Sequence, residues 1–312
     1  MRNFLGIDVG SISTKGVLID ESGMVRSSSY LYTHGNPIQA IKKVLRNLDT
    51  NYEISGVGTT GSARRLAGVM IGADVIKNEI IAHALAASYF CPEARTVIEI
   101  GGQDSKIIIL RDGMPVDFAM NTVCAAGTGS FLEQQAYRLG IPIEKFGELA
   151  LRSSNKVNIA GRCTVFAESD MVHKAQLGVP VEDIIRGLCD AIVRNFFTVV
   201  AKGKETSSPV LFQGGVAANV GVRKSFEEAL GTEIIVPEHF CLMGAIGAAT
   251  LAKQEMDHKE TKFLGFSLLD TRFSNRVLQC DGCPNRCEVV EILKENEVID
   301  RYGDRCGKWQ VV

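Results

Sequence analysis

Two cysteines, Cys124 and Cys163, each stand directly before a stretch that is predicted to start a helix. Cys124 precedes the small residues of "AAGTGS" and then "FLEQQAYRLG", and Cys163 precedes "TVFAESDMVHKAQLG". The N-terminus of a helix carries a partial positive charge, which stabilises a thiolate or an anionic cluster. An iron–sulfur cluster generally needs four thiolates, and a two-fold axis between identical chains would double each ligand. The pair is therefore either half of a shared cluster site or two cysteines of an ordinary core.

Four more cysteines lie near the C-terminal end with the spacing C-x2-C-x3-C-x18-C: Cys280, Cys283, Cys287 and Cys306. Four thiolates can close a tetrahedral zinc site or hold an iron–sulfur cluster, and the spacing leaves both open. The segment "EVVEILKENEVIDRY" between the third and fourth predicts a β-hairpin around Glu295 and Asn296. We therefore predict a small metal-binding extension over residues 264–312, after a polar link at residues 251–263.

Three glycine-rich loops could bind a nucleotide. The loops "DVGSISTKG" and "EIGGQDSK" offer backbone N–H groups and hydroxyls that can surround phosphate oxygens. A carboxylate at or near each loop, Asp8 and Asp104, suits Mg²⁺, which prefers oxygen ligands. The third stretch, "PVLFQGGVAANVGV", predicts a strand, a Gly-Gly turn and a helix start, where a nucleotide could lie against the backbone.

The elements that must position these loops form an internal repeat. Residues 4–30 and 97–120 each predict a strand, a turn, a second strand, a glycine turn and a third strand. Asp8, Gly10 and Lys15 align with Glu99, Gly101 and Lys106 at constant spacing. Duplication on this scale indicates two similar units.

Composition excludes several classes of protein. The 312 residues carry a net charge of −2, so no basic excess indicates a nucleic-acid partner. No apolar run reaches the roughly 18 residues of a membrane span, and "MRNFLGIDVGS" lacks the apolar core of a signal peptide. We expect a cytoplasmic protein whose cysteines are not paired in disulfides. Cys91, Cys189 and Cys241 are predicted to be small core residues.

The three loops resemble the phosphate-1, phosphate-2 and adenosine motifs of the acetate kinase/sugar kinase/Hsp70/actin superfamily, over roughly residues 3–253. Together with "NTVCAAGTGSFLE" and "CTVFAES", they resemble the activator component of 2-hydroxyacyl-CoA dehydratases, in the BadF/BadG/BcrA/BcrD ATPase family. The resemblance implies an α/β fold of two ribonuclease-H-like lobes, the actin-like ATPase fold, with ATP in the cleft between them. Lobe I would span residues 1–92, completed by a helix at about 243–256, and lobe II would span 93–242.

The resemblance also implies roles for the loop residues. Asp8 would position Mg²⁺ and its water shell, and Gln103 or Asp104 would orient the hydrolytic water. Glu99 stands where the wider superfamily more often has Asp, and its longer side chain could alter the metal geometry. The residues expected to contact the nucleotide are Gly10, Ser11, Ser13, Thr14, Lys15, Gly101, Gly102, Gln103, Gly214, Gly215 and Val216.

For the cysteines, the resemblance implies a homodimer bridged by one [4Fe–4S] cluster through Cys124 and Cys163 of both chains. A ferredoxin or flavodoxin would reduce this cluster. ATP binding and hydrolysis would then drive one electron into a partner iron–sulfur protein, either a dehydratase or a related double-cubane-cluster reductase. The extension lies outside the pattern of the minimal activators. Two other functions stay open: a metabolite kinase of the same fold, and a non-redox regulatory ATPase.

Overall fold

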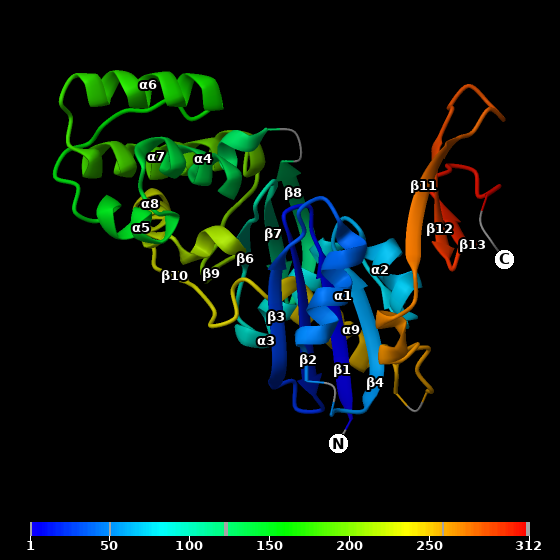
Figure 1. The fold of residues 1–312 in the computed structure, drawn as a ribbon. Helices are drawn as coiled ribbons and strands as arrows, with labels where there is room; N and C mark the ends of the chain where they lie inside the picture. Colours follow the sequence, from blue (N-terminus) through cyan, green and yellow to red (C-terminus); the bar gives the residue numbers. More distant parts are fainter. Residues whose placement is uncertain (1, 50, 122–123, 258, 310–312) are drawn as a thin grey trace. The chain divides into compact units, whose positions relative to one another are not determined.

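The structure, a computed structural model, describes residues 2–49, 51–121, 124–257 and 259–309. The chain divides into two compact units, Met1–Ala82 with Gly244–Val312 and His83–Met243 (Figure 1). Among the described residues, no helix is long and apolar enough to cross a membrane. Cys91 and Cys189 are buried, as predicted, and burial raises the pKa of Cys189 to about 12. Cys241 is instead half-buried, because it lies in the turn before helix α9 (Met243–Glu255).

The first unit is built on a five-stranded sheet in the order β3-β2-β1-β4-β5. Strand β1 runs antiparallel to β2 and parallel to β4, and all seven of its residues are buried. Helices cover both faces of this central strand pair, which requires small residues. A Cβ on Gly6 would lie 1.9 Å from the Ala245 carbonyl oxygen of α9, and one on Gly16 would lie 2.4 Å from Val44. The bounds are β1 (Asn3–Val9), β2 (Ser13–Asp20), β3 (Val25–Tyr32), α1 (Pro37–Asn47), β4 (Ile54–Thr60), α2 (Arg64–Ile71) and β5 (Val75–Ile76).

The second unit repeats this topology with the sheet order β10-β9-β6-β7-β8. Again the first strand is antiparallel to the second and parallel to the fourth, so the duplication predicted from the sequence is confirmed at the level of the sheet. The strands are β6 (Thr96–Ile100), β7 (Ser105–Arg111), β8 (Met114–Asn121), β9 (Val210–Gln213) and β10 (Ile234–Ile235).

The described helices of the second unit form its other layer, where α6 packs on α7 and lies outermost (Figure 1). A buried cluster of aromatic rings (Phe196, Phe212 and Phe226) joins these helices to the sheet. The helical elements are α3 (Glu79–Phe90), which spans the division between the units, η1 (Ala125–Gly127), α4 (Gly129–Leu139), α5 (Ile143–Ala150), α6 (Thr164–Gln176), α7 (Val181–Asn195), η2 (Phe196–Val200), η3 (Gly215–Ala218) and α8 (Val220–Leu230).

The C-terminal extension is a three-stranded antiparallel sheet that belongs to the first unit. Its predicted hairpin is confirmed: the chain turns at Glu295 and Asn296, both with positive φ (48° and 71°), which matches the two-residue turns that follow strand twist. Its elements are η4 (Phe266–Leu269), β11 (Phe273–Gln279), β12 (Glu288–Lys294) and β13 (Glu297–Tyr302).

The extension shares a hydrophobic core with α1 and α2. Leu268, Phe273 and Ile292 are buried in the same cluster as the residues of those helices. The Lys42 ammonium of α1 also donates to the carbonyl oxygens of Leu269 (2.9 Å) and Thr271 (2.6 Å). Helix α9 ends at Glu255, and Leu251 and Ala252 are buried on its inner face, so the first residues of the predicted link at 251–263 belong to the helix.

Candidate nucleotide and cysteine sites

The turn between β1 and β2 forms the first loop. The Gly10 N–H donates to the Ser13 carbonyl oxygen over 2.9 Å, which closes the turn. Asp8 and Lys15 lie opposite each other in the ladder, and the Lys15 ammonium is 3.1 Å from the Asp8 carboxylate. Asp8 is buried and Ser11 is exposed at the tip. The loop therefore presents an exposed tip beside a buried carboxylate that is paired with a half-buried lysine.

The turn between β6 and β7 repeats this geometry in the second unit. The Gly101 N–H donates to the Asp104 carbonyl oxygen over 2.9 Å. Lys106 lies opposite Glu99 and is 2.8 Å from both the Glu99 and Asp104 carboxylates. Burial alone would lower the pKa of Lys106, but the negative charges of Glu99 and Asp104 hold it above its ordinary value. The lysine is therefore a fixed cation under this loop.

A glycine in the left-handed region packs against each acid; Gly214 was predicted as a nucleotide contact, whereas Gly61 was not predicted. Gly61 follows β4 with φ +89°, and a Cβ there would lie 2.5 Å from the Asp8 carboxylate. Gly214 follows β9 with φ +88°, and a Cβ there would lie 2.8 Å from the Glu99 carboxylate. The signal was present as a glycine at the end of the fourth strand of both repeats. Because these two glycines have no side chain, each carboxylate can lie at the base of its loop.

The hydroxyl-bearing residues of the first loop are divided between its surface and its interior. Ser13 and Thr14 are buried, and the Thr14 hydroxyl is 3.0 Å from that of Thr33. Thr33 in turn donates to the Gly10 carbonyl oxygen over 3.0 Å. Thr14 thus maintains the shape of the loop through Thr33, a residue that the sequence motif did not include.

The third loop follows β9 as predicted, with a Gly-Gly turn that leads into η3 and α8. Gly215 is exposed, and a Cβ there would meet nothing within 4 Å among the described atoms. Val216 is buried and lies 3.2 Å from the Cβ position of Gly129, at the start of α4. The turn is therefore exposed at Gly215, and its buried side packs against the start of α4.

The structure brings the two predicted cluster cysteines together. Cys124 directly precedes η1, after which α4 begins at Gly129, and Cys163 is the N-cap residue of α6. The Cys124 thiol lies 3.9 Å from the carbonyl oxygen of Arg162, the residue before Cys163. Both thiols are partly exposed. Residues 122 and 123 of the first cysteine motif lie outside the described residues.

Polar side chains hold the two cysteine segments in place. The Asn121 amide donates to the Cys124 carbonyl oxygen over 2.7 Å and accepts from its N–H over 3.2 Å. Asn195, buried on α7, donates to the Gly161 carbonyl oxygen over 2.6 Å. Its amide oxygen lies so close to Gly127 that a Cβ there would clash with it, so Asn195 contacts both cysteine segments. Arg138 and Glu168 join α4 to α6 across 3.0 Å.

The four cysteines of the extension lie at one end of its sheet. Cys280 and Cys287 face each other at the end of the β11–β12 ladder, where the Cys280 N–H donates to the Cys287 carbonyl oxygen over 2.8 Å. Cys283 and Cys306 are exposed. Within the residues that the structure describes, no group of three or more His, Cys, Asp or Glu side chains is arranged to hold a metal ion. The arrangement as it stands therefore does not fit a closed four-thiolate site.

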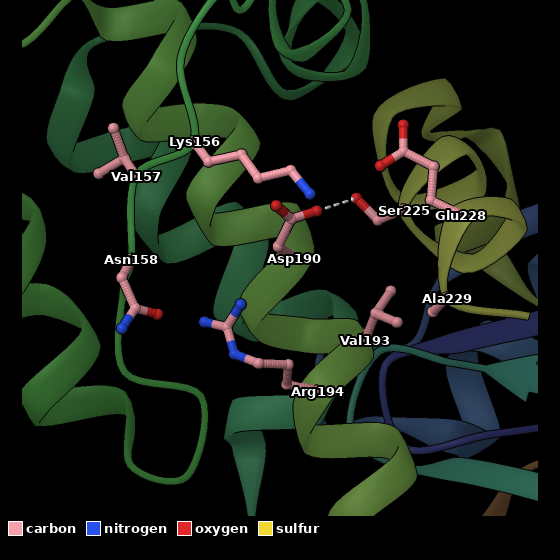
Figure 2. A pocket seen from close by; sticks show the side chains of 9 residues that line it. All are labelled: Lys156, Val157, Asn158, Asp190, Val193, Arg194, Ser225, Glu228 and Ala229. Atoms are coloured by element: carbon pink, nitrogen blue, oxygen red, sulfur yellow. Dashed lines mark hydrogen bonds between the residues drawn. The ribbon is translucent and has the colours of Figure 1, made fainter.

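A surface pocket of about 430 Å³ lies elsewhere in the second unit (Figure 2). Figure 2 shows Asp190 and Ser225 directed toward each other, joined by a hydrogen bond of 2.6 Å. None of the predicted site residues lines this pocket. Its lining is Lys156, Val157, Asn158, Asp190, Val193, Arg194, Ser225, Glu228 and Ala229.

The fold of this chain is shared with other α/β proteins. The chain superposes on a ROK family glucokinase from Streptomyces griseus in complex with glucose and AMPPNP, with a TM-score of 0.51, 16% sequence identity and coverage of 81% of this chain and 99% of that one. At this identity the likeness shows a shared α/β fold alone. Residues 5–252 match the BadF/BadG/BcrA/BcrD ATPase family, and the chain belongs to this family.

Two relatives within the family cover most of the chain. The (R)-2-hydroxyglutaryl-CoA dehydratase activating ATPase of Acidaminococcus fermentans is 36% identical over 253 residues, which are 80% of this chain and 96% of that protein. The structure of the activator of the 2-hydroxyisocaproyl-CoA dehydratase from Clostridium difficile with bound ADPNP superposes with a TM-score of 0.76 and 33% identity, over 81% of this chain and 95% of that one. The family resemblance drawn from the motifs is thereby confirmed.

Proposed function

We propose that this chain is an ATP-hydrolysing activator that drives one electron from a [4Fe–4S] cluster, shared by two copies through Cys124 and Cys163, into a partner iron–sulfur enzyme. The observation that carries the proposal is the meeting of these two cysteines at the starts of two helices, in the unit that also holds the second phosphate-type loop. Names of relatives such as the dehydratase activating ATPase support a dehydratase, or a related reductase, as the acceptor.

The donor set fits half of a cluster. Each chain offers two partly exposed thiols, Cys124 before η1 and Cys163 at the N-terminus of α6. When bound, the cluster would supply a one-electron carrier. Asn121 fixes the backbone at Cys124, and Asn195 contacts both cysteine segments, so the two ligands are positioned before the cluster is assembled.

A second copy of the chain is the proposed source of the remaining two thiolates. Next to Cys163, α6 exposes Val165 and Phe166 (64% and 66% of their surface), and Leu177 at its far end is 64% exposed. Large apolar side chains gathered on one exposed helix are typical of an interface. We propose that α6 packs in a homodimer, with the cysteines of both copies near the two-fold axis.

The loops are proposed to bind Mg²⁺-ATP. Backbone N–H groups of the two hairpin turns and the exposed Gly215 would contact the nucleotide, and Asp8 would hold the water shell of Mg²⁺. Between the two candidates for orienting the hydrolytic water, we favour Gln103. It is exposed at the tip, whereas Asp104 is already paired with Lys106 and shapes the loop.

The electron donor and the extension complete the proposal. A ferredoxin or a flavodoxin is proposed as the reductant. The cysteines of the extension are kept as a candidate zinc or second iron–sulfur site, which would need the exposed Cys283 and Cys306 to move toward Cys280 and Cys287. The side chain of Lys308 lies 3.6 Å from the Cβ position of Gly282, so the last described segment already reaches this end of the sheet.

Two substitutions separate the nucleotide role from the cysteine role. Cys124→Ser is expected to abolish the iron-dependent colour and electron transfer but to leave ATP binding unchanged, since the thiol does not belong to the loops. Asp8→Ala is expected to keep the colour and lose hydrolysis. These two expectations are tested by measuring the nucleotide affinity, the ATP hydrolysis rate and the iron content of each variant purified without oxygen.

Cys241→Ser, in the same unit and similarly half-buried, is the control and should leave all three quantities unchanged. A Cys124→Ser variant that keeps its full iron content refutes the shared cluster.

A further inference from the structure

The cysteine-bearing segment is hydrogen-bonded directly to the second phosphate-type loop. The backbone N–H of Gly129 donates to the Gly101 carbonyl oxygen, and that of Ser130 donates to the Gly102 carbonyl oxygen, each over 2.9 Å. The Ser130 hydroxyl donates to the same Gly102 carbonyl oxygen over 2.6 Å. Every one of these groups lies in the second unit, so the contact is internal to one compact body.

The first unit shows what this loop looks like without cysteines. There the Gly10 carbonyl oxygen, which corresponds to that of Gly101 in the repeat, accepts from the hydroxyl of Thr33 directly after β3. In the second unit the chain after β8 instead passes through Cys124 and η1, and the start of α4 occupies the loop carbonyls. A hydroxyl cap in one repeat is thus replaced in the other by the start of α4, the helix that follows Cys124 and η1.

Tight packing makes this contact a rigid one. A Cβ on Gly129 would lie 3.1 Å from the Gly101 carbonyl oxygen and 3.2 Å from Val216 of the third loop. The start of α4 is therefore enclosed by two of the three candidate nucleotide loops. A peptide group of the hairpin turn that rotates to present its N–H to phosphate must also move its carbonyl oxygen, which α4 holds.

We infer that Ser130 is a positioning residue that couples the nucleotide loop to the Cys124 segment. The inference rests on the proposed function and deepens it by naming the contact through which bound nucleotide acts on the cysteine. The Ser130 hydroxyl shares the Gly102 carbonyl with its own backbone N–H, so movement of that carbonyl displaces the first turn of α4 and the segment that begins at Cys124. Among the described residues, the hydrogen bonds of Ser130 to the loop both go to the Gly102 carbonyl oxygen, so its expected effect is on coupling rather than on nucleotide binding.

Hydrogen exchange of the full chain, with and without Mg²⁺ and ADPNP, tests this. In the wild type, nucleotide should slow exchange in residues 100–106 and also in residues 124–139. In Ser130→Ala, residues 100–106 should be protected as before, while the protection of 124–139 falls about fivefold, the equivalent of one hydrogen bond of about 1 kcal/mol. Ser130→Thr keeps the hydroxyl and should restore the protection of residues 124–139.

The matched control is Ser88→Ala. Ser88 also donates its hydroxyl to a glycine carbonyl of the same sheet, that of Gly113 over 2.8 Å, but at the β7–β8 turn. This variant should behave as the wild type in both segments.

Equal protection of residues 124–139 in Ser130→Ala and wild type would overturn the inference, as would loss of protection of residues 100–106 in Ser130→Ala. If nucleotide protects only 100–106 in the wild type, the inference fails and the ATPase proposal stands. If it protects neither, both fail.

Discussion

At the scale of single residues, the two repeats share a buried acid, a lysine opposite it and a left-handed glycine beneath it. Asp8 with Lys15 and Glu99 with Lys106 occupy the same register position in their ladders. The pairs were predictable because alignment of the repeats places them at the same spacing from the turn. Gly61 and Thr33 were not, because their contacts to Asp8 and Gly10 form only when distant strands pair.

Gly61→Ala tests the fit of the acid beneath the first loop. The added methyl would meet the Asp8 carboxylate and the Val9 carbonyl oxygen, each at 2.5 Å, in addition to the strain of a left-handed backbone. We expect the free energy of unfolding to fall by about 3 kcal/mol, measured by denaturant titration. Gly35→Ala is the control, because its φ is +68° but its Cβ would meet nothing described within 4 Å. It should lose only about 1 kcal/mol. Equal losses would show that the Asp8 contact imposes no constraint.

At the scale of elements, both strand–turn–strand repeats, both cysteine-linked helices and the extension's hairpin follow from local pattern. The helix after Cys124 ends at Gly140 (φ +66°), as the glycine and the following Pro142 indicate. What local pattern could not indicate is where the extension packs. About half of the residues in its strands are apolar, but the pattern does not name the surface that they pack against. Only the assembled first unit shows that Leu268, Phe273 and Ile292 complete the core under α1 and α2.

Ile292→Ala tests whether the extension is part of the first unit. Ile292 is fully buried in the shared core, so its truncation should lower the free energy of unfolding by about 3 kcal/mol. Val277→Ala on the neighbouring strand β11, where the side chain is 59% exposed, should change it by less than about 0.5 kcal/mol. Calorimetry or denaturant titration measures both. An extension that unfolds separately, without affecting the main transition, would contradict the shared core.

At the scale of the whole molecule, two observations point beyond one chain. The proposed cluster would take two cysteines from each chain where a cluster generally needs four, and α6, which begins after Cys163, exposes apolar side chains. The cysteine motifs and the family resemblance indicated from sequence alone that each chain offers only two cysteines. The exposure of Val165 and Phe166 required the structure, because α6 is apolar on several faces and its buried side cannot be told from the pattern.

The central claim is the shared cluster, and the most direct measurement is the iron, sulfide and zinc content per chain of protein purified without oxygen, together with its mass in solution. A dimer with about two irons and two sulfides per chain is the predicted result, since one four-iron cluster is divided between two chains. Zinc, or about four further irons per chain, would assign the metal of the extension. A colourless protein without iron after anaerobic reconstitution, or a monomer that binds a complete cluster, would contradict the account.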